Sequence, residues 1–192
     1  MIAMPTLTPQ IALPRWLQAG ALSLALGLVA GCENYPATGD TVTTGTYEAT
    51  ATVTQTWRAE YARSFDRRQT IHMETFQSNS LVNRNGLRPE GAATGPDDEG
   101  LYWPALPPRP TADELEARKR EPIEQRTDPM LLREVDYALT FDYNGQRRTL
   151  PTSRTVYREA SQAFADQQAL EITFGPGEQS IGAARRMASF DR

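Results

Sequence analysis

The chain has 192 residues, the length of one ordinary domain, with 20 basic and 24 acidic side chains and a net charge of −4. This mildly acidic balance, without a cluster of lysine and arginine, argues against nucleic acid as a partner and against electrostatic binding to anionic lipid. With one histidine and one cysteine, the sequence also lacks the ligands of a zinc site and cannot form an internal disulfide.

An apolar segment, residues 16–31, dominates the start of the chain, and Arg15 is the single basic residue before it. At roughly 15 residues the segment is shorter than the ~20 that span a bilayer, and its length is typical of the apolar region of a signal peptide. The segment runs into the sequence Leu28-Val29-Ala30-Gly31-Cys32. This sequence resembles the lipobox of bacterial lipoproteins.

The lipobox resemblance implies that residues 1–31 are a signal peptide, that cleavage follows Gly31, and that the sulfur of Cys32 carries a diacylglyceryl group. The protein is then extracytoplasmic and held in the cell membrane or the outer membrane by acyl chains such as palmitate. Two or three acyl chains make such attachment effectively permanent. In the alternative, residues 16–31 are never cleaved, a helix tethers the protein, and Cys32 is incidental.

Beyond Cys32 the sequence predicts a tether, one domain and a tail. Residues 32–45 are rich in Pro, Gly, Thr and Asn, which is typical of a flexible tether. We expect a single β-rich domain over residues 46–176, with an irregular insertion at 83–129, and a frayed tail at 177–192. The expected fold class is α+β: a small, mainly antiparallel β-sheet domain with one or two short helices and a long Pro/Gly-rich insertion.

The first half of the domain predicts a hairpin. Apolar and polar residues alternate from Thr46 to Tyr61, which indicates a long strand with one face in water. Residues 64–67 can turn the chain, and residues 69–76 alternate again. The Asn85-Gly86 and Gly95-Pro96 pairs then mark a loop.

A short helix is predicted within the insertion, over residues 112–121. Thr111 and Glu114 form a capping box at its start, and Pro122 ends it. The charged pairs Glu114/Arg118 and Glu116/Arg120 have helical spacing. Leu115 is the one large apolar side chain, so we expect this helix to be mostly solvated.

The second half predicts a strand over 131–143, an Asn144-Gly145 turn of type I′, and a returning strand over 146–150. A helix over 154–166 and a strand over 170–174 follow. The helix carries Val156, Ala160, Ala163 and Phe164 on one face. This order, ending in a Gly/Pro stop and Ser180, resembles the core of a small β-rich domain of unknown function common in bacterial membrane-associated proteins. The resemblance covers residues 131–180 and implies a fold but no activity.

Few residues in the sequence indicate a catalytic or metal-binding site. His72 is expected among polar partners on the second face of its strand; in an alternative it joins Glu74 or Asp136 and a hydroxyl in a hydrolase site assembled by folding. Residues 97–99 (Asp-Asp-Glu) lack the spacing of a calcium loop and predict a solvated acidic loop. No phosphate-binding loop or nucleophile elbow is present in the sequence, so we expect no cofactor, no metal and no catalytic residue.

The segment 101–110 is the best candidate for an interaction surface, because large aromatic side chains often anchor interfaces. We expect it to be extended, as polyproline II. Its candidate residues are Tyr102, Trp103, Pro104, Pro107 and Pro108. The reading we favour is the plainer one, in which these residues fold back over the sheet and close its core. The sequence as a whole predicts a non-catalytic, lipid-anchored binding or scaffolding protein of the cell envelope, with another envelope protein as its partner.

Overall fold

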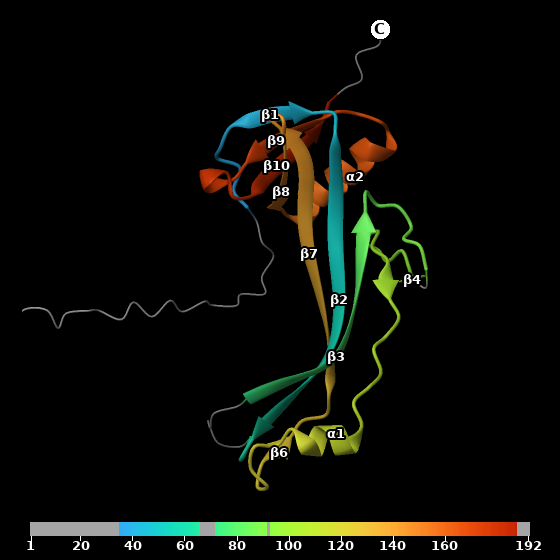
Figure 1. The fold of residues 1–192 in the computed structure, drawn as a ribbon, viewed down its shortest axis with the longest axis vertical. Coiled ribbons are helices and arrows are strands. Elements are labelled where there is room, and N and C mark those ends of the chain that lie inside the picture. Colours follow the sequence, from blue (N-terminus) through green and yellow to red (C-terminus); the bar gives the residue numbers. More distant parts are fainter. Residues whose placement is uncertain (1–34, 66–71, 92, 188–192) are drawn as a thin grey trace, which may run out of the picture. The chain divides into compact units, whose positions relative to one another are not determined.

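The computed structural model describes residues 35–65, 72–91 and 93–187 (Figure 1). They belong to a unit that begins at Cys32, and they form a small, mostly antiparallel β domain with two short helices. No helix in these ranges is long and apolar enough to cross a bilayer. The predictions for residues 1–31, for Gly31 and Cys32 and for the second half of the turn at 64–67 lie outside the described residues.

The main sheet has the strand order β3-β2-β7-β8, and a short fifth strand, β6, pairs beside the end of β2. Its strands are β2 (Tyr47–Ala62), β3 (His72–Arg84), β6 (Gln125–Arg126), β7 (Met130–Tyr143) and β8 (Gln146–Pro151). The predicted pairing of the first two long strands is confirmed. β3 is longer than the predicted strand 69–76, and its last two residues lie inside the range 83–129.

Hydroxyl groups help to hold β3 against β2 beyond Phe76, where residues 77–80 carry no large apolar side chain. Thr54 of β2 and Ser80 of β3 are hydrogen-bonded at 2.9 Å, and Thr56 and Ser78 at 2.8 Å. These cross-strand pairs stabilise the water-facing side of the sheet. On the other side of β2, the side chains of Ala49, Ala51 and Val53 are completely buried, as the alternation predicts.

A second sheet has the order β1-β9-β10, and β1 pairs antiparallel with β9 as β10 does. The elements at this end are β1 (Thr41–Thr44), α2 (Arg154–Ala165), β9 (Leu170–Phe174), a 3₁₀ turn (Pro176–Glu178) and β10 (Ile181–Arg186). The turn between β7 and β8 has φ of 50° at Asn144 and 74° at Gly145, the two positive values that a type I′ turn requires.

Two predictions about the chain ends are wrong where the structure describes them, at residues 35–45 and 177–187. Residues 32–45 were predicted to be a flexible tether. Instead, the backbone N–H groups of Thr38 and Gly39 donate to Phe174 O, and β1 pairs with β9. Residues 177–192 were predicted to be a frayed tail. Instead, β10 pairs with β9, and Ile181 is completely buried. The described parts of both segments are rich in Thr, Gly and Ala, and no alternation of large apolar residues marks β1 or β10 as a strand.

Both helices are confirmed, each with a correction. α1 (Ala112–Ala117) has the predicted capping box between Thr111 and Glu114, but it is shorter than the predicted helix 112–121. The arginines expected to pair along α1 contact Glu74 of β3 instead, at 3.9 Å from Arg118 and 3.4 Å from Arg120. In α2, Val156, Ala160 and Ala163 are buried as predicted. Phe164 is 39% exposed, and Tyr157 is buried in its place.

The buried apolar residues form two separate clusters. The larger cluster joins α2, β9, β10 and one end of the main sheet, and its aromatic members are Phe141, Phe174 and Tyr157. The smaller cluster consists of Ala59, Tyr61 and Leu115, with Phe76 packed against it. It lies at the end of the sheet that carries α1 and β6. We call this end the tip.

Candidate functional site

The predicted interaction segment, residues 101–110, runs from β4 (Ala93–Thr94) to α1 alongside β3 (Figure 1); we call it the strap. Within it, β5 (Trp103–Pro104) pairs with β4. Leu101 is buried in the larger cluster, and half-buried Trp103 packs against that cluster. Tyr102 and Pro104 are half-buried as well. This half of the strap therefore covers the core, as in the reading of the sequence that we favoured.

Three side chains from β2 and β3 hold the backbone of the strap against the sheet. Asn83, which is completely buried, makes two hydrogen bonds to one strap residue, and the other two side chains make one each. The bonds are Tyr102 N to Asn83 Oδ1 at 2.8 Å, Asn83 Nδ2 to Tyr102 O at 3.0 Å, Asn79 Nδ2 to Ala105 O at 2.9 Å, and Trp57 Nε1 to Pro107 O at 2.9 Å. All of these bonds use side chains of the sheet, so they leave the outward-facing backbone N–H and C=O groups of β3 unpaired.

The end of the strap, with β3 and α1, encloses a cavity of about 600 Å³. That volume lies within the range of about 300–1,000 Å³ that is usual for small-molecule sites. The predicted residue Pro108 is exposed and lines the cavity, whereas Pro107 is buried behind it. The lining consists of Thr75, Phe76 and Gln77 of β3, Pro108, Arg109 and Pro110 of the strap, Thr111 before α1, and Glu114, Ala117 and Arg118 at α1.

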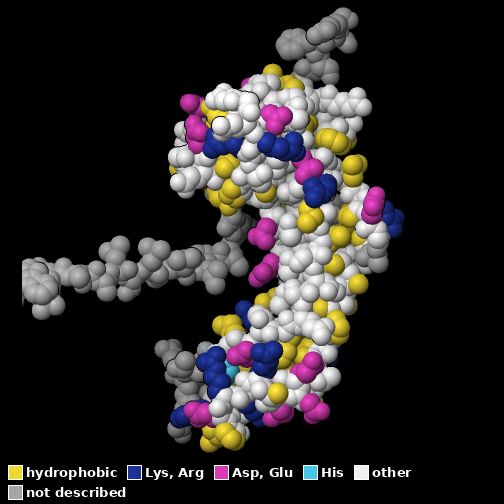
Figure 2. Space-filling view, in the orientation of Figure 1, with side chains coloured by type: hydrophobic (Ala, Val, Ile, Leu, Met, Phe, Trp, Pro, Cys, Tyr) yellow, Lys and Arg dark blue, Asp and Glu magenta, His cyan; other side chains and the backbone are white. Residues whose placement is uncertain are grey.

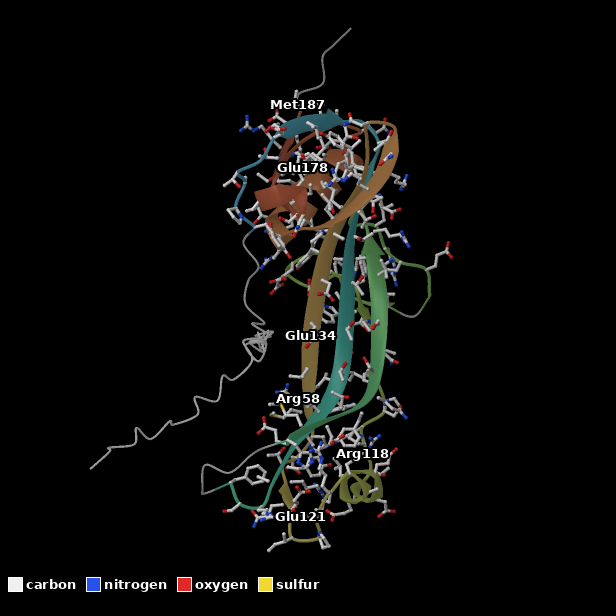
Figure 3. All side chains as sticks on the ribbon, turned by 60° about the vertical axis from the view of Figure 1, so that its left-hand side comes forward. Arg58, Arg118, Glu121, Glu134, Glu178 and Met187 are labelled. Carbon is white, nitrogen blue, oxygen red and sulfur yellow. The ribbon has the colours of Figure 1, made fainter. Side chains whose placement is uncertain are left out.

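Two guanidinium groups give the cavity a positive character. Arg109 lies over the ring of Trp57 at 5.8 Å, and Arg118 lies over the ring of Phe76, also at 5.8 Å. Figure 3 labels Arg118 beside α1. The third charged lining residue, Glu114, uses Oε2 to accept from the backbone N–H of Thr111 at 2.7 Å and from its hydroxyl at 3.0 Å. These hydrogen bonds lower the pKa of Glu114 and engage its charge locally.

His72 lies near this cavity but is not part of its lining. Its ring stacks on Tyr61 with 5.0 Å between centroids, and Nδ1 is 3.5 Å from Glu124 Oε1. Nε2 is buried 3.8 Å from Glu74 Oε1 and has no hydrogen-bond partner within the described ranges. His72 therefore lies between two carboxylates, among polar groups as the sequence analysis expected.

The hydrolase alternative needs a hydroxyl and a carboxylate beside His72. The hydroxyl of the stacked Tyr61 donates to Leu115 O at 2.8 Å, and no serine or threonine hydroxyl bonds to His72 in the part of the chain described. Of the two suggested carboxylates, Glu74 is present. Asp136 pairs with Thr52, nine residues along β2 from Tyr61, and does not join the group.

Charges of both signs surround His72 at the tip, as Figure 2 shows. Glu124 is 9% exposed, and its Oε2 accepts from the backbone N–H groups of Arg120 at 2.7 Å and Glu121 at 3.3 Å. Burial acts to raise the pKa of Glu124, but these bonds and the neighbouring His72 and Arg120 outweigh it and lower the pKa. The arrangement is that of a structural network in which each carboxylate has protein donors or cations beside it.

Of the acidic residues 97–99, Asp97 holds the strap in place and Glu99 contacts α2. Asp97 Oδ1 accepts from the backbone N–H groups of Glu99 and Leu101, each at 2.9 Å, and Oδ2 accepts from Trp103 Nε1 at 2.7 Å. Glu99 forms an ion pair with Arg154 at 2.6 Å. Across residues 35–65, 72–91 and 93–187, no group of three or more His, Cys, Asp or Glu side chains is placed to hold a metal ion.

The cavity and its two arginines were not predicted from the sequence. Pro108 was a predicted interaction residue, whereas Arg118 was predicted only to pair with Glu114 and Arg109 had no predicted role. Their positions over Trp57 and Phe76 depend on how the strap and α1 lie on the sheet, which no local pattern encodes. The pair Arg109-Pro110 directly before the capping box that starts at Thr111 was the available signal, because it places a cation at the start of a solvated helix.

Comparisons with protein-family models, curated proteins and solved structures found no match. The functional assignment therefore rests on the residues and the geometry of this chain.

Proposed function

We propose that this protein is a non-catalytic, lipid-anchored binding protein of the bacterial cell envelope, attached through acyl chains on Cys32. The supporting observation is where the folded domain begins. The chain divides between Gly31 and Cys32, where the lipobox resemblance places signal-peptide cleavage. The described domain starts almost directly afterwards, and Pro36 and Ala37 already lie against Gly182 of β10.

A short connection to the lipid follows from this arrangement. Four residue steps separate Cys32 from Pro36, and an extended chain covers at most ~3.6 Å per step, about 14 Å in all. The end of the domain formed by β1, β9 and β10 is then held close to the bilayer surface. The cavity borders Thr75, which pairs with Arg58 near the far end of β2. At ~3.3 Å per residue, that point lies roughly 35 Å along the strand from Tyr47.

The fold supports two finer assignments that belong to the same proposal. We class the domain as α+β, with residues 83–129 as a Pro/Gly-rich insertion that carries the strap and α1. The order of β7, the Asn-Gly turn, β8, α2 and β9 supports the resemblance of residues 131–180 to the small β-rich bacterial domain. His72 and its carboxylate neighbours support a structural role rather than the hydrolase alternative.

Fatty-acid labelling tests the anchor. The natural protein and the Cys32→Ser variant are expressed in a bacterium supplied with an alkyne-tagged palmitate analogue, and the mass of each mature N-terminus is measured. We expect label and added lipid mass on a chain that begins at Cys32, and neither in the variant. A mature chain that begins upstream of Cys32, or one that carries no lipid mass, overturns the proposal and favours the uncleaved helix.

A further inference from the structure

The outer edge of β3 has no partner strand in the part of the chain described. The inference drawn from this edge concerns the binding partner of the protein, and it therefore rests on the proposed function. β3 is the terminal strand of the main sheet and, in the part of the chain described, pairs with β2 alone. Within the same ranges, no backbone hydrogen bond links residues 72–83 to any element other than β2. The outer N–H and C=O groups of this strand are therefore free to pair.

The composition of this edge favours strand addition. Residues 75–83 read Thr-Phe-Gln-Ser-Asn-Ser-Leu-Val-Asn, with no charged residue and no proline. Exposed edge strands are usually protected by lysine, proline or a covering segment, and an unprotected edge recruits another extended chain. The strap does not provide that protection, because it bonds to the side chains of Asn79 and Asn83 and leaves the backbone edge open.

The charge beside this edge selects the kind of chain that it receives. At Thr75 to Gln77 the edge borders the cavity that contains the guanidinium groups of Arg109 and Arg118. Arg109 forms no ion pair with a described carboxylate, and Arg118 Nη1 is 3.9 Å from Glu74 Oε2, beyond hydrogen-bond range. Guanidinium groups bind carboxylates through paired N–H donors, so an acidic group is the complement of this cavity.

We propose that β3 binds an extended acidic segment of a partner protein as an additional strand, with a carboxylate of that segment held in the cavity by Arg109 and Arg118. A second copy of this chain is a poorer occupant. Symmetric pairing across Thr75 to Gln77 brings the arginines of the two copies together, and like charges in close contact oppose association. A free small anion uses the arginines but leaves the unpaired strand edge without a role.

Peptide binding to the full-length protein in detergent micelles tests this inference. The probes are two fluorescein-labelled libraries of short Thr/Val/Ser peptides, one ending in glutamate with a free carboxylate and one ending in glutamine amide. Fluorescence anisotropy measures binding. We expect the acidic library to bind at least tenfold more tightly than the amide library. We expect Arg109→Gln and Arg118→Gln each to weaken it by about tenfold, the effect of losing one charged hydrogen-bonding partner.

The matched control is Arg185→Gln, which removes an arginine from β10 whose side chain is 82% exposed, and it should leave binding unchanged. Hydrogen exchange should show that bound peptide protects backbone amides of residues 72–83 and none in β10. Circular dichroism verifies folding of each variant; Arg109→Lys and Arg118→Lys, which keep the charge but lose the paired donors, replace any variant that fails this check.

Four outcomes overturn the inference: no binding, equal binding of both libraries, an equal loss in the Arg185→Gln control, or protection outside β3. A concentration-dependent dimer with β3 protected in the absence of peptide assigns the edge to a second copy and also overturns it. Because binding in micelles does not require acylation, the two proposals fail separately. Loss of peptide binding leaves an acylated Cys32 unaffected, and an unacylated Cys32 leaves peptide binding unaffected.

Discussion

At the residue scale, one carboxylate holds the start of the strap in place. Asp97 accepts hydrogen bonds from the Glu99 and Leu101 backbone and from the Trp103 indole. Burial acts to raise the pKa of Asp97, but the three hydrogen bonds and the nearby Arg154 outweigh it, so the pKa is lower than the usual 3.8. The ionised form is therefore the better acceptor for all three donors.

Removal of this carboxylate tests its contribution. We expect Asp97→Ala to lower the free energy of unfolding at neutral pH by about 1 kcal/mol, at the low end for bonds to a charged group because water screens the exposed loop. The folded pKa lies below the unfolded value, so this contribution is complete above pH 3.8 and is lost as the pH falls through the folded pKa.

Urea unfolding of both proteins at neutral pH and at about pH 3 measures the difference. We expect the gap between wild type and Asp97→Ala to narrow in acid, and a gap that stays constant contradicts the role of the charge. The matched control is Asp98→Ala, which removes an exposed neighbouring carboxylate and should leave stability unchanged.

At the scale of elements, the docking of the N-terminal segment depends on one glycine. A Cβ at Gly182 of β10 would lie 2.6 Å from the backbone of Ala37 and from Pro36 O. Backbone atoms cannot move aside as a flexible side chain can, so we expect Gly182→Ala to cost about 1–3 kcal/mol of stability. Limited proteolysis should then cleave within residues 36–44, while the rest of the domain stays resistant.

Gly45→Ala is the control for that prediction. It lies between β1 and β2, and a Cβ there has no atom within 4 Å. We expect the free energy of unfolding and the proteolysis pattern to remain those of the natural protein. Equal cleavage in both variants, or in neither, contradicts the docking.

The same elements show which parts of the fold a sequence can predict. β2, β7 and β9 were predictable because large apolar residues alternate along them, and the Asn144-Gly145 turn was predictable because its backbone requires positive φ. β1 and β10 were not, because both are short and rich in Thr, Gly and Ala, and large apolar residues do not alternate along them. The cavity was missed for a related reason: Arg109 and Arg118 become neighbours only when the strap and α1 lie on β3.

At the scale of the whole domain, the two apolar clusters predict unequal stability along one sheet. The larger cluster contains 14 buried residues from both sheets and α2, whereas the cluster at the tip contains three. Regions with few buried apolar contacts open locally at a lower free energy than the rest of a protein. The tip carries the cavity, so local opening there would move the cavity walls without unfolding the end of the domain that contains the larger cluster.

Two matched leucine truncations separate the clusters. Leu139 is completely buried in the larger cluster, and Leu115 is 3% exposed at the tip. We expect Leu139→Ala to lower the free energy of global unfolding by about 2–5 kcal/mol, as is usual for a core leucine. We expect Leu115→Ala to change global unfolding by less than about 1 kcal/mol and to accelerate hydrogen exchange in α1 and β6 at least tenfold, because it destabilises only the locally opening unit. If Leu115→Ala lowers global stability as much as Leu139→Ala does, the sheet transmits the loss from one end to the other and the domain unfolds as a single cooperative unit.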